Sequence, residues 1–207
     1  MFITFEGPEG SGKSLQTRLL VDRLHAAGHT VLETREPGGT PLGDQLRHVL
    51  LVRADLEIVG RAEALLMCAA RAQLVERAIR PALERGEVVV CDRFGDSTLT
   101  YQGYGRGLNV DDLRAVISFA TAGLEPDMTI LLDLPVDAGL ARKQAQAAWT
   151  RFEAETLAFH EQIRAGYLSL AAAHPDRWVR LDAHRPPDAI ASEIWQRVSE
   201  RMQARRP

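Results

Sequence analysis

The chain has 207 residues, which fits one domain over 1–207, and its charged residues sum to a formal net charge of −3. With 45% hydrophobic and 26% charged residues, the composition is that of a folded globular protein and excludes a disordered or collagen-like chain. The slight excess of acid argues against broad nucleic-acid binding, which needs a basic surface. The longest apolar run, 64–70, is too short to cross a membrane, and 1–10 shows no export signal. Cys68 and Cys91 lie in apolar runs, so we expect buried thiols in a reducing, cytoplasmic compartment.

Short apolar, β-prone runs alternate along the chain with stretches in which apolar residues recur every three or four positions. The runs predict strands at Phe2–Phe5, Thr30–Glu33, Val88–Cys91, Met128–Leu132 and Trp178–Leu181. One periodic stretch includes 15–24 and predicts a helix that ends at Gly28, and another includes 65–74 and predicts a long helix that ends before Pro81. Further helices are predicted at Val110–Ala122, Val136–Ala145, Phe152–Ala173 and Pro187–Met202. Strands that alternate with helices pair in parallel, so the pattern predicts a layered α/β fold.

The first predicted strand runs into GPEGSGKS at 7–14, which matches the pattern G-x-x-x-x-G-K-[ST] in full and opens the first helix. Glycines let backbone N–H groups approach phosphate oxygens, and the helix N-terminus favours negative charge there. Lys13 can reach the β- and γ-phosphates, and the Ser14 hydroxyl can bind Mg²⁺. The pattern therefore predicts a nucleoside triphosphate site with Mg²⁺, formed by Gly7, Pro8, Glu9, Gly10, Ser11, Gly12, Lys13 and Ser14.

Two other classes of phosphate-loop protein fit less well. A GTPase needs an Asn-Lys-x-Asp motif, and the only asparagine, Asn109, lies in another context. An ATPase motor usually has paired acids after the second signature strand, whereas here Asp92 is followed by Arg93. An acid at that place can hold a Mg²⁺-bound water and a cation can hold a second phosphate, which favours transfer between two phosphorylated ligands.

The stretch TREPGGTP at 34–41 supports an acceptor phosphate. Arg35 follows the second predicted strand, beside a Pro-Gly-Gly turn, and a guanidinium can bind a phosphate with two parallel hydrogen bonds. Ligands of open α/β sheets gather at the carboxyl ends of the strands. We therefore expect Arg35, Asp92, Arg93 and the 7–14 loop to meet at one edge.

At this point several blocks, in order from residue 3 to about 182, resemble the bacterial thymidylate kinase family: TFEGPEGSGKS, REPGGTPLG, AARAQLVERAIRPAL, VCDRFGDSTLTYQGYGRG and LLDLPVDAGLAR. The resemblance implies the P-loop kinase fold, a five-stranded parallel sheet with helices on both faces. It implies transfer of the γ-phosphoryl group of ATP to dTMP and a homodimer. ATP and dTMP are then the partners, without nucleic acid or membrane.

The resemblance also implies roles near the phosphates. Glu9 matches an acid that contacts the 3′-hydroxyl of the acceptor sugar, and Arg35 matches an arginine on the dTMP phosphate. Arg93 matches an arginine near both phosphates. Asp92, with Ser14, is expected at the metal, and Glu36-Pro37 matches a place where the family often has a cis peptide.

Further matches concern the two bases. Arg71 matches an arginine that hydrogen-bonds thymine, while Thr98 and Gln102 fall in the segment that reads the base. Tyr101 matches a ring that crowds a ribose 2′-hydroxyl. The stretch Leu181-Asp182-Ala183 resembles a loop that lines the adenine pocket.

Two places depart from the family pattern. Met67 stands where a phenylalanine usually stacks on the base, which predicts weaker or broader base recognition because methionine is more flexible. The lid, about 142–152, has glutamines at 144 and 146 where arginines are usual and lacks the glycine, so we expect a short, helical lid. Arg151 is the predicted catalytic lid arginine, and Arg142 is expected against the adenine or its phosphates, with Lys143 a partial substitute.

These departures leave two alternatives open. One is a kinase for another nucleoside monophosphate, with Met67 marking a changed base pocket. The other is a low-activity, nucleotide-binding regulatory protein with a degenerate lid, against which Arg35 and the Asp92-Arg93 pair argue.

Overall fold

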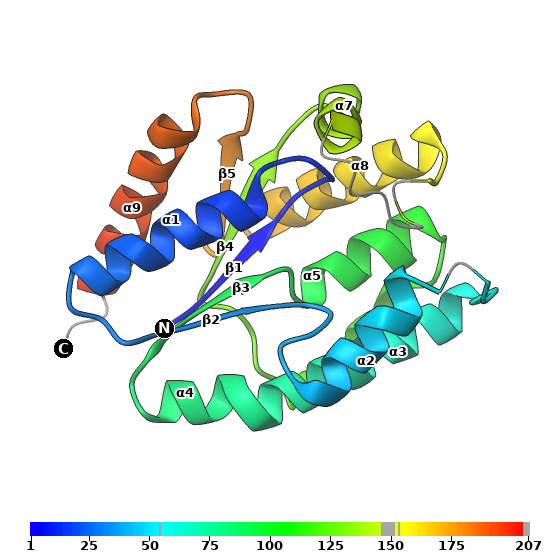
Figure 1. The fold of residues 1–207 in the computed structure, drawn as a ribbon, viewed down its shortest axis with the longest axis horizontal. Coiled ribbons are helices and arrows are strands. Elements are labelled where there is room, and N and C mark those ends of the chain that lie inside the picture. Colours follow the sequence, from blue (N-terminus) through cyan, green and yellow to red (C-terminus); the bar gives the residue numbers. More distant parts are fainter. Residues whose placement is uncertain (54, 146–151, 153, 205–207) are drawn as a thin grey trace.

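A five-stranded sheet in which all neighbouring strands are parallel forms the centre of the molecule, in the order β2-β3-β1-β4-β5 (Figure 1). The computed structural model describes all residues except 54, 146–151, 153 and 205–207. The strands are β1 (Phe2–Glu6), β2 (Val31–Arg35), β3 (Val88–Asp92), β4 (Met128–Asp133) and β5 (Trp178–Asp182). The predicted five-stranded parallel α/β sheet is confirmed. Because all five strands point the same way, their carboxyl ends share one edge.

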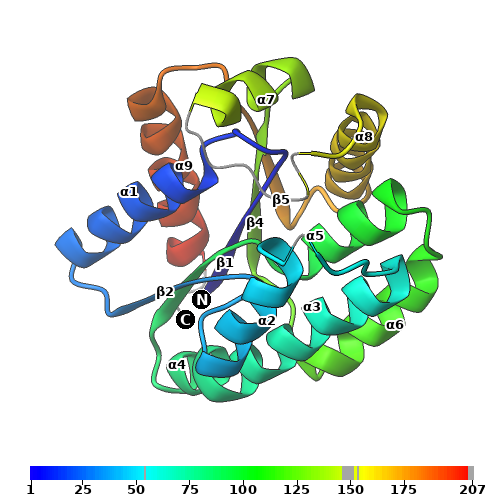
Figure 2. The same cartoon turned by 45° about the vertical axis from the view of Figure 1, so that its right-hand side comes forward.

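Helices cover both faces of the sheet (Figures 1 and 2). On one face lie α1 (Lys13–Ala26) and α9 (Pro187–Gln203). The remaining segments are α2 (Pro41–Leu51), α3 (Gly60–Leu74), the π-helix η1 (Val75–Ile79), α4 (Arg80–Glu84), α5 (Gly95–Thr98), the π-helix η2 (Leu99–Gly105), α6 (Val110–Thr121), α7 (Val136–Ala145) and α8 (Leu157–Ala173). No helix in the described part of the chain is long and apolar enough to cross a membrane.

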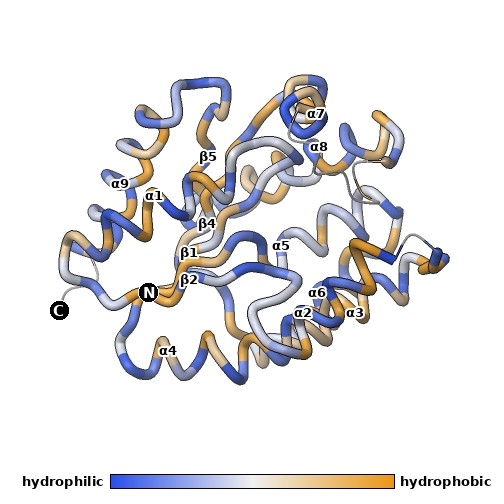
Figure 3. Tube along the Cα trace, in the orientation of Figure 1, coloured by the Kyte–Doolittle hydropathy of each residue, from blue (hydrophilic) through white to orange (hydrophobic). Residues whose placement is uncertain are grey.

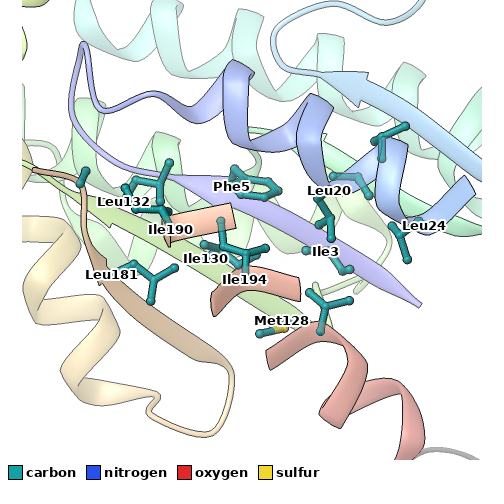
Figure 4. Close-up of a cluster of buried hydrophobic side chains, with 14 of the residues drawn as sticks. Ile3, Phe5, Leu20, Leu24, Met128, Ile130, Leu132, Leu181, Ile190 and Ile194 are labelled. Carbon is teal, nitrogen blue, oxygen red and sulfur yellow. The ribbon is translucent and has the colours of Figure 1, made fainter. Parts of the chain in front are cut away.

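The inner strands are buried on both faces, as their continuous apolar runs predict. On the α1–α9 face, Ile3, Phe5 and Ile130 pack against Leu20 and Ile194, as Figure 4 shows. Hydrophobic residues concentrate accordingly along the inner strands in Figure 3. A second cluster joins α3, η2, α6 and α8, and a third lies where η1 and α4 cover β1 and β3. This packing fixes the strand ends, where the functional groups lie.

Two predicted helix ends are wrong. The helix predicted over Phe152–Ala173 begins at Leu157, because the Thr156 side chain accepts a hydrogen bond from the backbone N–H of Phe159 and so caps it there. The helix predicted to end before Pro81 continues through η1 and α4 to Glu84. Proline lacks the N–H that an α-helix needs, and the wider turn of η1, with Arg80 N–H bonded to the Val75 carbonyl, precedes it.

Two helical segments were not predicted at all, namely α2 and the pair α5–η2. Helix α2 begins with Pro41 in its first turn and with Thr40 as its cap, whose hydroxyl accepts from the Gly43 N–H at 3.0 Å. Both segments follow the carboxyl ends of strands, β2 and β3, and therefore contribute directly to the site.

Candidate functional site

A cavity of about 360 Å³ opens at the carboxyl edge of the sheet. Thirteen of the predicted binding and catalytic residues line it: Glu9, Gly10, Gly12, Lys13, Ser14, Arg35, Met67, Arg71, Asp92, Arg93, Thr98, Tyr101 and Gln102. Gly7, Pro8, Ser11 and Arg142 do not line it, and Arg151 lies outside the described residues. The sequence therefore predicted which strand ends meet, and the structure brings them together.

The 7–14 loop wraps tightly because glycine stands where a side chain could not. Gly10 has φ +69°, and a Cβ there would lie 2.1 Å from the carbonyl oxygen of Gly139 in α7. The Lys13 ammonium donates to the carbonyl oxygens of Gly7 (3.0 Å) and Pro8 (2.9 Å). Burial and the nearby Arg93 charge lower the pKa of Lys13 to about 8, against the opposing effect of the carboxylates around it.

Arg142 ties the loop to the end of the sheet. Its guanidinium lies 3.4 Å from the Gly10 carbonyl and 3.2 Å from that of Ala183, which follows β5. Ala183 belongs to the stretch expected beside the adenine. Arg142 therefore lies between the 7–14 loop and the end of β5, outside the cavity itself.

Oxygen donors suited to a hard cation meet beside the loop. The Ser14 hydroxyl donates to the Asp92 carboxylate at 2.6 Å, which joins the start of α1 to the end of β3. Hydroxyl and carboxylate oxygens fit Mg²⁺, which usually keeps several waters and binds substrate phosphates as well. No cluster of three or more His, Cys, Asp or Glu side chains suited to a metal occurs among the described residues. Ser14 and Asp92 therefore fit a metal that the nucleotide helps to hold.

Arg93 stands at the centre of the cavity, with its backbone in the left-handed region at φ 70°. Its guanidinium donates to Glu9 at 2.9 Å and to the Tyr167 hydroxyl at 3.0 Å, and it lies 5.0 Å over the Tyr101 ring. Burial raises the pKa of Glu9, but the charges of Arg93 and Lys13 outweigh this and hold it at about 2. Tyr101 also donates a hydrogen bond to Glu9. Glu9 therefore stays ionised and keeps Arg93 and Tyr101 aligned.

Glu6, the last residue of β1, binds the residues around Arg93 and was not predicted from the sequence. Its carboxylate is fully buried and accepts from the Phe94 N–H (2.9 Å), the Ser97 hydroxyl (2.6 Å) and the Tyr167 hydroxyl (2.8 Å). Burial and the charge of Asp96 raise its pKa to about 7, although Arg93 lowers it. The signal was a charged residue at the end of an otherwise apolar buried strand, which needs partners.

Arg71 enters from α3 and is 2% exposed. Its Nε donates to Glu36 at 2.8 Å, and its Nη2 reaches both Thr98 and the Phe94 carbonyl at 3.1 Å. The pKa of Glu36 is raised by burial, against the pull of Arg71. The peptide between Glu36 and Pro37 is cis, as expected. Only Nη1, whose one contact in the described chain is a long one to Cys68 Sγ (3.7 Å), remains as a donor for a ligand.

Arg47 is another functional candidate that sequence reasoning missed. It lies two turns into α2 and lines the cavity near Arg35, and its guanidinium donates to the Pro37 carbonyl at 2.9 Å. Burial and the charge of Arg35 lower its pKa. Neither arginine has a carboxylate salt bridge within the described ranges, so together they form a site for an anion. Recognising a capped helix after the Gly38-Gly39 turn would have placed Arg47 here.

Cys68 and Cys91 are free thiols and buried, as predicted. Burial also raises the pKa of both thiols. Neither cysteine lines the cavity, so we assign them no part in it.

Comparisons with known proteins agree with this arrangement. The family model described as thymidylate kinase matches residues 5–194. A thymidylate kinase from Thermomicrobium roseum is 54% identical over 202 residues, 97% of this chain and 95% of that protein. One from Deinococcus radiodurans is 53% identical, covering 97% of each. The crystal structure of thymidylate kinase from Ehrlichia chaffeensis superposes with a TM-score of 0.78 at 30% identity, over 96% of this chain and 98% of that one. The chain belongs to the thymidylate kinase family.

Proposed function

We propose that the protein transfers the γ-phosphoryl group of ATP to dTMP, giving dTDP for dTTP synthesis. One observation carries this function: a phosphate-binding loop, the Asp92-Arg93 pair and a cationic acceptor site open into a single cavity. Family membership supports both ATP-dependent transfer and the acceptor. Catalysis of this kind rests on positioning and charge stabilisation, without a covalent enzyme intermediate.

The donor half is formed by the 7–14 loop. Its N–H groups and Lys13 would hold the β- and γ-phosphates in place of the contacts that Lys13 makes with the Gly7 and Pro8 carbonyls. Arg142 would lie against the nucleotide from the Ala183 side. Ser14 and Asp92 would hold Mg²⁺, which supplies charge neutralisation on the phosphate oxygens when bound.

Arg93 is the proposed catalytic arginine because it lies between the two halves. It is fixed by Glu9 and Tyr167, so its charge is already in place where negative charge moves from donor to acceptor. Glu9 and Tyr101 face the same space and would contact the acceptor sugar. Arg35 and Arg47 would hold the acceptor phosphate in line.

The base end is lined by Met67, Arg71, Thr98 and Gln102. Met67 has a long, unbranched side chain that can pack against bases of different shape. This property favours a second candidate function. That candidate is phosphorylation of another pyrimidine monophosphate, such as dUMP or dCMP, alongside dTMP.

We propose that 142–152 acts as the lid and that Arg151 stabilises the transferring group. The described part supports this: Lys143 and Phe152, at its two ends, both line the cavity. The ring of Phe152 meets that of Tyr101 edge-on, with centroids 5.5 Å apart. A closed lid would exclude water and so limit hydrolysis of ATP. A degenerate lid is the basis of the regulatory alternative.

We further propose a cytoplasmic homodimer. Phe119 on α6 is 90% exposed and Leu65 on α3 is 58% exposed, and these helices pack side by side (Figure 2). Apolar side chains exposed together mark association surfaces. The free thiols of Cys68 and Cys91 fit a reducing compartment.

A coupled ADP-release assay with ATP, Mg²⁺ and dTMP, dUMP, dCMP, dGMP, UMP or no acceptor tests the function. Strong turnover with dTMP alone is the expected result. Comparable turnover with dUMP or dCMP would support the broader kinase. ATP binding without acceptor-dependent turnover would contradict the enzyme and support the regulatory protein.

A further inference from the structure

A buried carboxylate, Glu63, lies directly behind the base end of the cavity. It projects from the first turn of α3 and has no exposed surface. It accepts a hydrogen bond of 2.7 Å from the side-chain Nε2 of Gln102. A fully buried carboxylate is costly unless it is paired, so a specific task for Glu63 needs explanation.

The Glu63 carboxylate fixes which way the Gln102 amide points. An ionised carboxylate only accepts hydrogen bonds, so the Gln102 group facing it must be the NH₂. Arg106 places positive charge beside this carboxylate, with its Nε 3.5 Å from Glu63 Oε1 and its Nη2 3.4 Å from Oε2. Arg106 is in turn held by Glu155 at 2.6 Å and by the ring of Phe159.

The amide oxygen of Gln102 is consequently the group left for a ligand. Gln102 lines the cavity, and no donor within the described chain bonds to its Oε1. In the same cavity, Arg71, which hydrogen-bonds Thr98 four residues before Gln102, offers Nη1, a donor that cannot lose its proton. The base end therefore presents one fixed donor and one fixed acceptor.

We propose that Glu63 is a positioning residue for base selection: through Gln102 it selects an acceptor base with a ring N–H over one with a ring nitrogen lone pair. Thymine and uracil offer a carbonyl oxygen beside a ring N–H, which complements a donor beside an acceptor. Cytosine offers an amino group beside an unprotonated nitrogen, which opposes both. This inference rests on the proposed function, since it concerns the same acceptor site.

The test compares kcat/KM for dTMP, dUMP and dCMP in wild type and Glu63→Gln. In the variant, a side-chain amide can meet Gln102 with either its oxygen or its NH₂, so the Gln102 amide is no longer fixed and can turn its own NH₂ toward the base. The dTMP-to-dCMP ratio should fall at least about tenfold, the effect of one mispaired buried hydrogen bond. The dTMP-to-dUMP ratio should not change, because both bases carry the ring N–H.

A second variant separates orientation from packing. In a Gln102→Ala background there is no amide to orient, so adding Glu63→Gln should leave the dTMP-to-dCMP ratio unchanged. Glu76→Gln, which removes an exposed carboxylate of the segment after α3, is the matched control for loss of charge. The same ratios measured as Kd by calorimetry decide the inference if turnover is slow.

Three results would overturn the inference. A dTMP-to-dCMP ratio within twofold of wild type in Glu63→Gln would do so, and so would an equal loss for all three acceptors, which indicates a purely structural role. Equal use of dCMP and dTMP by the wild type is the third. Absence of dTMP turnover in the wild type contradicts the proposed function instead, and the calorimetric ratios then decide the inference separately.

Discussion

Lys13 and Arg93 show how single residues set the chemistry of the cavity. Lys13 is buried and Arg93 is largely buried, and both are held by oxygen atoms of the loop and its acid, Glu9. A buried cation with fixed partners keeps one orientation, so its charge acts at one place. In the proposed mechanism the roles of the two residues are separable, because Lys13 acts on the donor phosphates and Arg93 on both donor and acceptor.

Lys13→Ala should abolish phosphoryl transfer, because no other cation in the described loop can neutralise the β- and γ-phosphates. Steady-state ADP release with dTMP measures it. Arg18→Ala, an exposed cation on the same helix, is the control and should keep wild-type turnover. Turnover near normal in Lys13→Ala would contradict the assignment of the loop.

The raised pKa of Glu6 predicts a pH dependence of stability. Its pKa moves from 4.5 to about 7 on folding, so between these values the native state binds more protons than the unfolded state. The stabilisation associated with protonated Glu6 is therefore complete below pH 4.5 and is lost as pH rises through about 7. The lowered pKa of Glu9 affects stability in another pH range. The stabilisation associated with ionised Glu9 is complete above pH 4.5 and is lost as pH falls toward about 2.

Glu6→Gln should consequently flatten the free energy of unfolding against pH between 4.5 and 7. The change in slope should approach 1.4 kcal/mol per pH unit, the value for about one proton. Urea unfolding at several pH values measures it, and Glu76→Gln is the control. An unchanged slope would show that Glu6 keeps an ordinary pKa.

At the scale of elements, α2 shows how a local signal places a distant charge. Thr40 caps the helix and Pro41 occupies its first turn, and two turns later Arg47 reaches the cavity. The helix therefore brings a second arginine to the one at the end of β2. Its first residues are set by capping, which is local chemistry.

Arg47→Ala should raise KM for dTMP about tenfold or more, because one charge-assisted contact to the acceptor phosphate is lost. KM for ATP should stay within about twofold, since the donor phosphates lie at the 7–14 loop. Initial-rate kinetics with each substrate varied in turn distinguish the two. A larger increase in KM for ATP than in KM for dTMP would place Arg47 at the donor phosphates instead.

The strands were predicted within two residues at each end, because buried parallel strands are continuous apolar runs. Helices α1, α6 and α9 were also close, since glycine, proline and a left-handed residue mark their ends. The π-helix before Pro81 escaped because its widened turn depends on packing against the sheet. Arg47 escaped because its helix was not predicted. Glu6 and Glu63 escaped for another reason: no local motif marks a buried charge whose partners lie far along the chain.

At the scale of the whole molecule, the cavity is lined by segments that are distant in sequence. The 7–14 loop, α2, η2 and both ends of the proposed lid meet at one edge of the sheet. The proposed lid lies in the chain between β4 and β5. Closing it would complete the site around bound substrates.

Arg151→Ala should lower kcat far more than it raises KM for either substrate, because its contact is expected mainly in the transition state. The loss should be about 10³-fold, the lower end for a charge on the transferring group. Lys143→Ala, measured alongside, tests the other end of the lid. If only KM for dTMP rises, the lid role of Arg151 is wrong.

Phe119→Asp should shift the protein from dimer to monomer, since a charge would have to be buried in an apolar interface. Sedimentation across a range of protein concentrations measures the shift. Leu157→Asp, at another exposed apolar position far along the chain, is the control. A wild-type protein that sediments as a monomer would contradict the proposed dimer.

The contacts of Arg93 also have a thermodynamic consequence. Its guanidinium is held by Glu9, Tyr167 and Ser97, which belong to the fold itself, so its ordering entropy is lost once, during folding. A charge delivered by lid closure is ordered again in every cycle. The entropy of activation should therefore report on the lid, while Arg93 contributes almost entirely through enthalpy.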